Sequence, residues 1–420
     1  MPVLNTRRLS NNITLIFLAL LLYCFFVFIV ANEQLIAYVA LFECILMVLL
    51  SRKDNIILAL FVLLLWFNYS IFIPFTVLPI DNFFTQYRSS DSSLRALGFL
   101  FLFDTILCLL SIRISGFPIQ HTFRSQRHHS NSFISFGSFI FLIFIFIFGI
   151  DRSAGIGVRS DPSPLYEYSV ILFIIGYHYA GTQSDRKRLT ILLLLFSVQN
   201  LILAGRITAL QLVLVYYLVS VMPDTKVFKY LPCVLLAFLT FSIVGALRGS
   251  LFDGSIRDFG IHSILDQKFT LDTAYSAFHT SITFYKTEEI ISVSSRILLL
   301  GQYIKYLVFG GEVPDSNLSN FTHDYYDHYY GGVLPNYCQF YLGIIGIVLI
   351  SLYIGGILLK VPRLSPVRRY RDCLVVYVIA TAPRWFLYTP TPLFRGVMFF
   401  SVTYGICFWF DQLCRKKVFV

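Results

Sequence analysis

Apolar residues in this chain form long, uninterrupted runs, and short polar segments between these runs hold most of the charged residues. About twenty apolar residues in a helix span the ~30 Å hydrocarbon layer of a membrane. The pattern therefore predicts twelve membrane-spanning helices. They are expected at residues 13–31, 34–50, 56–76, 96–112, 133–150, 165–182, 189–204, 207–222, 229–247, 336–359, 372–389 and 396–411.

One polar interval is much longer than the others. It begins at Arg248 and ends at Pro335, and it is the one place where a sizeable structure facing water is expected. Within it, residues 290–308 mix apolar positions with Arg296 and Lys305, which predicts an amphipathic helix on the membrane surface or against the other helices. The predicted organisation is a bundle of nine spans in 1–247, a large outer loop with amphipathic helical segments in 248–335, and three spans with a cytoplasmic tail in 336–420.

Composition agrees with this pattern. Of the 420 residues, 57% are hydrophobic and only 13% are charged, which excludes an ordinary soluble globular protein. The eight cysteines occur singly, and no C-x-x-C pair is present, so neither a disulfide framework nor a zinc site is indicated. The predicted fold class is an all-α polytopic membrane protein with about twelve transmembrane helices.

The net charge of +10 is compatible with nucleic-acid binding, but membrane topology explains it better. If the N-terminus is cytoplasmic, most of the 33 lysines and arginines fall in the cytoplasmic connections, as the positive-inside rule requires. Both termini are then expected in the cytoplasm. We expect no nucleic-acid partner.

The turn at Gly205-Arg206 joins two short predicted spans. Each span has about sixteen residues, or about 24 Å of helix, which is less than the hydrocarbon layer. Arg206 is therefore expected below the outer surface, where a cation costs ~2.5–3.5 kcal/mol unless it is paired or hydrated. Two interpretations stay open: Arg206 reaches out to the lipid headgroups, or it lines an anion site beneath the surface.

Other arginines share this placement at the expected outer edge. In these short connections and span ends arginine occurs without lysine, and a guanidinium suits bidentate recognition of phosphate. Interfacial anchoring would explain any one of them singly. A phosphate-bearing ligand that enters from the outer leaflet is the simplest common cause. The candidate binding residues are Arg206, Arg248, Arg384, Arg395, Arg152 and Arg159.

These features resemble a known family. Ala204-Gly205-Arg206 at the start of a middle span, arginine at the outer end of a later span, and a large outer loop before the third-last span are similar to the bacterial O-antigen (Wzy-type) repeat-unit polymerases. The loop exit, Gly331-Gly332-Val333-Leu334-Pro335-Asn336-Tyr337 followed by Phe340 to Gly346, is similar to their loop-to-helix junction. The resemblance covers the whole topology, through short motifs.

The resemblance implies a glycosyltransferase that moves a growing glycan from undecaprenyl pyrophosphate onto a lipid-linked repeat unit, at the periplasmic face of the inner membrane. It places the 248–335 loop in the periplasm and maps the family arginines onto Arg206 and Arg248. Implied partners are the lipid-linked donor and acceptor, the bilayer and a chain-length regulator in the membrane. An O-antigen ligase, and a flippase or other transporter, remain alternatives.

No cofactor or metal is expected for this chemistry. Preorganised cations can stabilise the leaving pyrophosphate without a metal. The chain also lacks a Gly-rich nucleotide loop, so a sugar nucleotide is not the expected donor.

The run from His323 to Tyr330 is the candidate for catalysis. His323, Asp324 and Asp327 are candidate general bases for the acceptor hydroxyl, and His323/Asp327 and Asp324/His328 would share faces if the run is helical. The two histidines and two aspartates are also adequate metal ligands, without an evident third element. The third interpretation is a solvated segment whose tyrosines, Tyr330 among them, stack on sugars or anchor at the interface.

Two acids, Glu43 and Asp104, fall inside predicted spans. Ionisable groups in the membrane are functional candidates. Hydrogen bonding within the bundle is the competing explanation.

Overall fold

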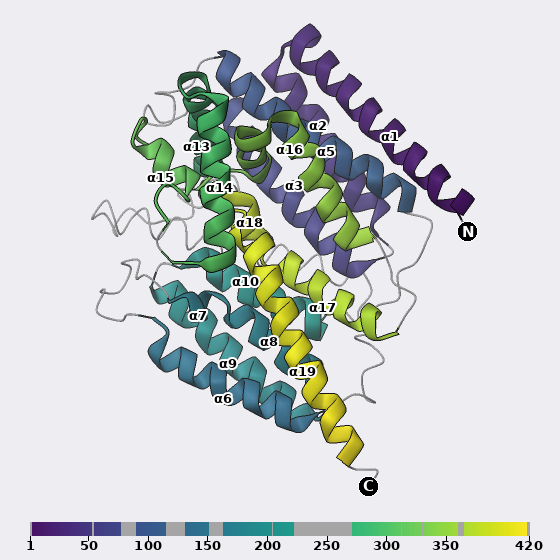
Figure 1. Cartoon of the computed structure of the whole chain (residues 1–420), viewed down its shortest axis with the longest axis vertical. Helices are drawn as coiled ribbons and strands as arrows, with labels where there is room; N and C mark the ends of the chain where they lie inside the picture. The colour runs from purple at the N-terminus through teal and green to yellow at the C-terminus, as the bar shows by residue number, and fades with distance from the viewer. Residues whose placement is uncertain are drawn as a thin grey trace. The chain divides into compact units, whose positions relative to one another are not determined.

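The computed structural model describes residues 2–52, 54–76, 90–114, 131–150, 163–203, 205–221, 271–311, 313–328, 331–359 and 365–417 (Figure 1). Every regular element in these residues is a helix, and no strand occurs among them. The chain divides into two compact units. Unit 1 comprises Met1–Pro118, Phe238–Lys360 and Trp385–Pro390, and unit 2 comprises Ile119–Ala237, Val361–Arg384 and Thr391–Val420.

The lengths of the apolar helices indicate a membrane protein. Within the described residues, six segments are long and apolar enough to cross a membrane: Ile13–Val30, Glu33–Leu50, Asn55–Phe72, Asp91–Ile112, Leu334–Leu358 and Pro392–Arg415. Three more apolar helices are shorter: Ser132–Phe148, Ser169–Tyr179 and Arg206–Ser220. The total of twelve spans stays a prediction, and the ninth, 229–247, lies outside the described residues.

Unit 1 is built around α5 (Ser90–Ile114), whose residues from Ala96 to Leu107 are buried. It packs against α1 (Pro2–Cys24), α2 (Glu33–Leu50) and α16 (Leu334–Leu359), and α2 packs in turn on α3 (Asn55–Thr76). After α1 the helix continues as a π-helical turn, η1 (Phe25–Val30). Large apolar side chains on the outer faces of α1, η1 and α2, such as Phe17, Phe28 and Phe42, are exposed. Such faces suit lipid, because large exposed apolar patches are rare in soluble monomers.

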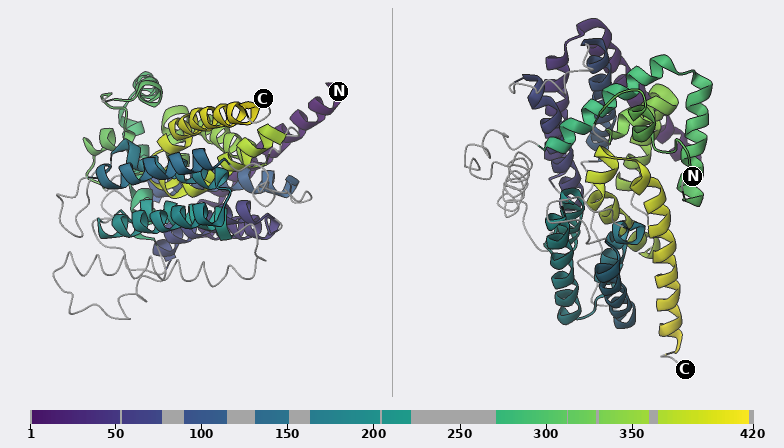
Figure 2. Two further views of the ribbon diagram at one scale, coloured as in Figure 1. Left: turned by 90° about the horizontal axis from the view of Figure 1, so that it is seen from below. Right: turned by 90° about the vertical axis from the view of Figure 1, so that its left-hand side faces the viewer.

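The described part of the 248–335 interval also folds into unit 1. It forms α13 (Asp272–Ile290), α14 (Val293–Phe309) and α15 (Leu318–His323). The amphipathic helix expected at 290–308 is confirmed as α14. The burial of α13 was not expected, since this interval was predicted to face water. Figure 2 shows α13 beside the N-terminal helices, and it packs on α3, α5 and α16.

Hydroxyl side chains explain how α13 can be buried despite its polar composition. Ser281 Oγ donates to Ala277 O at 2.9 Å, and Thr287 Oγ1 donates to Thr283 O at 2.9 Å. Ser and Thr thus satisfy their own hydrogens within the helix. The sequence pattern shows these residues only as polar.

Unit 2 is built around α8 (Ser169–Tyr179), which is buried along its whole length. Around it lie α6 (Ser132–Phe148), α9 (Gln183–Ile202), α10 (Arg206–Tyr216) and α17 (Ser365–Ala380), and α19 (Val397–Lys417) contacts α8 and α17. Short elements join them: α7 (Pro164–Glu167), η3 (Tyr217–Val221) and η7 (Pro392–Gly396). α18 (Ala382–Leu387) begins in unit 2 and ends in unit 1.

Several predicted spans differ in detail from the helices observed. The span expected at 189–204 begins earlier, at Gln183, because Thr182 and Asp185 form a capping box: Asp185 N donates to Thr182 Oγ1, and Thr182 N donates to Asp185 Oδ2. The span expected at 372–389 is two helices, α17 and α18, separated at Thr381.

Candidate functional site

The short helix α7 and the residue after it organise one end of unit 2. Its three consecutive residues Tyr166, Glu167 and Tyr168 each contact a different element. Tyr166 Oη donates to Gln199 Oε1 at 3.0 Å and accepts from Asn200 Nδ2 at 2.9 Å. Glu167 and Tyr168 contact elements that lie much later in the chain.

The turn that leads to Arg206 begins at Asn200, the residue that Tyr166 contacts. After α9 ends, Gly205 N donates to Asn200 O at 2.7 Å and closes the turn. A Cβ on residue 205 would lie 2.9 Å from Asn200 Oδ1, so the turn favours glycine. Arg206 is then the first residue of α10 and is only 7% exposed. The predicted turn agrees with this geometry, and the depth of Arg206 in the membrane stays a prediction.

A guanidinium at this position has an electrostatic consequence. The first turn of a helix carries unpaired N–H groups and a partial positive charge. A buried arginine there adds to that positive potential instead of offsetting it. The start of α10 is therefore suited to hold an anion.

Arg384 pairs with Glu167. The guanidinium Nη1 contacts Glu167 Oε1, and both side chains are partly buried. The backbone of Arg384 is fixed by a hydrogen bond from its N–H to Thr381 O at 2.9 Å, at the break between α17 and α18. The break lets a short helix present this arginine to α7.

Arg395 lies in η7 on the third element that reaches the α7 segment. Its Cζ lies 5.1 Å from the centre of the Phe399 ring, and Tyr168 packs edge-on against the same ring at 5.1 Å. The next residue, Gly396, approaches so closely that a Cβ would collide with Tyr377 Oη. Tyr377 Oη in turn donates to Pro392 O at 3.0 Å and holds the start of η7.

Residues 166–168 therefore contact α9, which leads through Gly205 to Arg206, and also Arg384 and the Phe399 ring beside Arg395. We call Arg206, Arg384 and Arg395, with Glu167, the arginine site. Counted over these four side chains alone, three guanidinium groups and one carboxylate give the arginine site a positive formal charge. Tyrosine and amide side chains surround it, and these can hydrogen-bond a polar ligand.

Four other predicted binding residues, Arg152, Arg159, Arg248 and Tyr330, lie outside the described residues.

The predicted catalytic run belongs to unit 1. α15 ends at His323, and Tyr325 N and Tyr326 N both donate to Thr322 O, which turns the chain. Residues 324–328 are thus not helical, and the helix face that would pair His323 with Asp327 and Asp324 with His328 does not form. Asp324 and Asp327 are exposed.

The two histidines of the run lie together. His328 is buried, its Nε2 lies 3.0 Å from Thr322 Oγ1, and its ring centre lies 5.3 Å from that of His323. Buried His328 therefore has a packing role in the turn. Among the candidate general bases, Asp324 and Asp327 are exposed and His323 is partly exposed.

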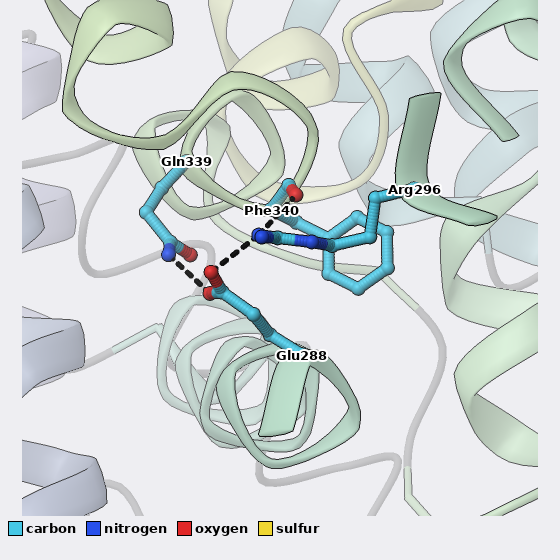
Figure 3. Close-up of polar contacts among 4 residues, drawn as sticks. All are labelled: Glu288, Arg296, Gln339 and Phe340. Carbon is cyan, nitrogen blue, oxygen red and sulfur yellow. Dashed lines mark hydrogen bonds and ion pairs between the residues drawn. The ribbon is translucent and has the colours of Figure 1, made fainter. Parts of the chain in front are cut away.

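Sequence reasoning missed a polar network that fixes the predicted loop to α16. Figure 3 shows Arg296 of α14 between Glu288 of α13 and the carbonyl oxygen of Phe340, to which Nη1 donates at 3.1 Å. Gln339 Nε2 donates to the other Glu288 oxygen. Glu288 and Arg296 are separated by the break between two helices, so no i,i+4 spacing reveals the pair.

The exit of the interval is also held tightly. Gly331 has φ +117°, which strongly favours glycine, and its N–H donates to Ser319 Oγ at 3.0 Å. At Gly332 a Cβ would lie 2.5 Å from the Phe284 ring of α13. These contacts give a packing reason for the Gly-Gly pair that the sequence analysis associated with a family motif.

In the part of the chain that the structure describes, His, Cys, Asp and Glu do not gather into a group of three or more that could hold a metal ion. The chain matches no family model, and comparisons with curated proteins and with solved structures give no match either.

Proposed function

We propose that this protein is a membrane glycosyltransferase that moves a growing glycan from undecaprenyl pyrophosphate to a lipid-linked repeat unit, and that the arginine site binds the pyrophosphate. As the glycosidic bond breaks, negative charge develops on the leaving pyrophosphate. Fixed guanidinium groups stabilise that charge with little reorganisation. In this proposal, both the glycan donor and the acceptor remain anchored in the bilayer by their lipids.

The observation that carries the proposal is the pairing of Arg384 with Glu167, in a segment that also packs beside the Phe399 ring under Arg395 and against α9, the helix before Arg206. Arginine inside a membrane protein is costly to bury and is a functional candidate by default. Glu167 balances one charge and holds Arg384 in position while the site is empty of ligand. Arginine suits this role better than lysine, because its planar fork binds phosphate through two parallel hydrogen bonds.

The placement of charge in unit 2 supports an outward-facing site. At the end of α8, Asn131 N donates to Tyr179 O, and Asn131 Nδ2 donates to Asp411 Oδ1 at 3.0 Å. The basic stretches 186–188 and 415–417 lie near this end, whereas α7 lies before the other end of α8. With the basic end cytoplasmic, the arginine site opens toward the periplasm of a bacterial inner membrane.

Two alternatives share parts of this proposal. An O-antigen ligase would use the same donor with a different acceptor, and a flippase would move the lipid-linked unit without transferring it. Lipopolysaccharide from a deletion strain separates these functions. Core capped with a single repeat unit is the expected result for a polymerase, and core without O-antigen would instead indicate a ligase or flippase.

Topology gives a separate prediction. Alkaline phosphatase fused after Leu300 is expected to be active, because 248–335 is proposed to be periplasmic. The same enzyme fused after Ser365 is expected to be inactive. The reverse pattern of activity would refute the proposed orientation, including cytoplasmic termini.

Metal dependence gives another prediction. Purified protein with lipid-linked repeat units is expected to polymerise them in excess chelator, since arginines neutralise the leaving group. Loss of activity that a divalent ion specifically restores would contradict this and would make His323, Asp324, Asp327 and His328 candidate ligands.

A further inference from the structure

A second polar cluster lies in the apolar core of unit 1, independent of the arginine site. Glu43 sits near the middle of α2 and Asp104 near the middle of α5, two helices that pack together (Figure 1). Asn68 of α3 lies beside Asp104, and Thr105 contacts Glu43. Both acids belong to segments long and apolar enough to cross a membrane.

Asp104 is the least satisfied member of the cluster. It is 0% exposed, and neither carboxyl oxygen has a hydrogen-bond partner. Asn68 Oδ1 is also buried without a donor, because the amide nitrogen donates to Leu64 O at 3.0 Å and to Cys44 Sγ at 3.3 Å. Asp104 and Asn68 thus hold three buried oxygens for which no hydrogen bond of normal geometry is present. Buried acceptors in this state cost free energy unless a donor is supplied.

The single hydrogen of the Thr105 hydroxyl also indicates a protonated carboxyl. Its Oγ1 lies 2.8 Å from Phe101 O and 3.0 Å from both Glu43 oxygens. A hydroxyl carries only one hydrogen. If that hydrogen goes to Phe101 O, the contact with Glu43 needs a hydrogen on the carboxyl itself. A protonated Glu43 satisfies both contacts at once.

In the described part of unit 1, no cation is found to act on the two carboxyls. Asp104 is affected by Glu43 and Asn68, and Glu43 by Thr105, while both carboxyls lie close enough to act on the thiols of Cys44 and Cys108. Among the described residues, no lysine, arginine or histidine of α1, α3, α13 or α16 is one of the groups that act on either carboxyl. Two adjacent carboxylates in an apolar core repel each other and are poorly solvated.

We propose that Glu43, Asp104, Asn68 and Thr105 form a membrane-buried proton-binding site, with both carboxyls protonated at neutral pH and titrating as a coupled pair. A proton on Asp104 removes the charge of a carboxyl that is fully buried, and a proton on Glu43 supplies the hydrogen that its contact with Thr105 needs. Deprotonation of either carboxyl opposes that of the other, so the pair shares its titration. The ligand of this site is the proton.

Labelling with dicyclohexylcarbodiimide tests the site in the full-length protein in proteoliposomes. This apolar reagent modifies protonated carboxyls in apolar surroundings, and peptide mass spectrometry locates the adduct. We expect labelling of Glu43 at neutral pH that declines as pH rises, and no adduct at this position in Glu43→Gln. In Asp104→Asn the midpoint of the decline is expected to fall by about one pH unit or more, because a neutral amide removes the coupled carboxyl.

Glu33→Gln is the matched control. Glu33 lies at the start of the same helix and contacts Ser93, so its loss should leave the Glu43 profile unchanged. A wild-type protein with no adduct at neutral pH, or an unchanged midpoint in Asp104→Asn, would overturn the proposal. Protection of Glu43 by sodium ions, but not by choline, would show a metal-cation site instead.

Infrared spectroscopy tests the protonation of these carboxyls in the wild-type protein, so the outcome does not depend on whether a variant folds. The difference spectrum of the wild-type protein between neutral and alkaline pH is expected to lose a C=O band of protonated carboxyls. If that band is absent at neutral pH, the carboxyls are ionised and the proposal fails.

Discussion

Arg206→Ala is expected to lower glycan transfer by about 10²–10³-fold while the protein still accumulates in the membrane. Removal of one preorganised group that stabilises developing negative charge has an effect of this order. Arg206 is buried at the start of α10, so no neighbouring water can easily replace its guanidinium. The measurement is polymerisation of lipid-linked repeat units by purified protein, with membrane content checked by immunoblot.

Matched variants separate charge from geometry. Arg206→Lys should restore only part of the activity, since a point charge replaces a bidentate fork. Arg248→Ala is expected to behave like Arg206→Ala, on the sequence alone. Arg415→Ala is the control, because Arg415 pairs with Asp411 at 2.9 Å one turn away on α19 and has no proposed role in binding. Full activity in both Arg206→Ala and Arg248→Ala would remove pyrophosphate binding by these residues.

Substitutions in the His323–Tyr330 run are expected to include at least one variant that binds the lipid-linked donor normally but transfers about 10²–10⁴-fold more slowly. That is the usual contribution of a positioned general base. His323→Ala, Asp324→Asn and Asp327→Asn are the informative changes. Donor binding is measured by retention of radiolabelled lipid-linked repeat units on the purified protein, and transfer is measured in the same preparation.

The structure sets the controls for this experiment. His328 is buried against Thr322, so His328→Ala is expected to lower stability as well as activity and needs a melting curve beside it. Asp315→Asn is the matched surface control, because Asp315 is exposed in the same interval and asparagine tolerates its φ of +54°. Wild-type rates in all the variants of the run would make it a surface segment only.

The α13–α14–α16 packing shows where sequence reasoning reached its limit. Apolar positions interspersed with Arg296 and Lys305 predicted α14, because an amphipathic helix carries its own periodic signal. No such signal marks α13, whose serines and threonines are satisfied inside the helix. The pattern therefore placed in water a helix that the fold buries. The Glu288–Arg296–Gln339 network was hidden for a related reason, since its members come from three helices.

The candidate site shows the same division. The sequence indicated that Arg206, Arg384 and Arg395 lie near the ends of apolar runs, which depends only on hydropathy. It gave no sign of Tyr166, Glu167 and Tyr168, because Glu167 and Arg384 are 217 residues apart. In the run from His323 the sequence allowed a helix, which would pair each histidine with an aspartate. In the structure a turn closed by Thr322 O brings the two histidines together instead, and both aspartates are exposed.

The sequence by itself determined that this chain is helical and membrane-embedded, because transfer of long apolar runs out of water depends on length and composition alone. It also located the Gly205-Arg206 turn, since short spans and a glycine define it locally. Only the tertiary structure decided which residues meet: Arg384 and Glu167, α13 and α16, and Glu43 and Asp104. Those contacts depend on how distant helices pack, and local periodicity carries no record of a helix's neighbours.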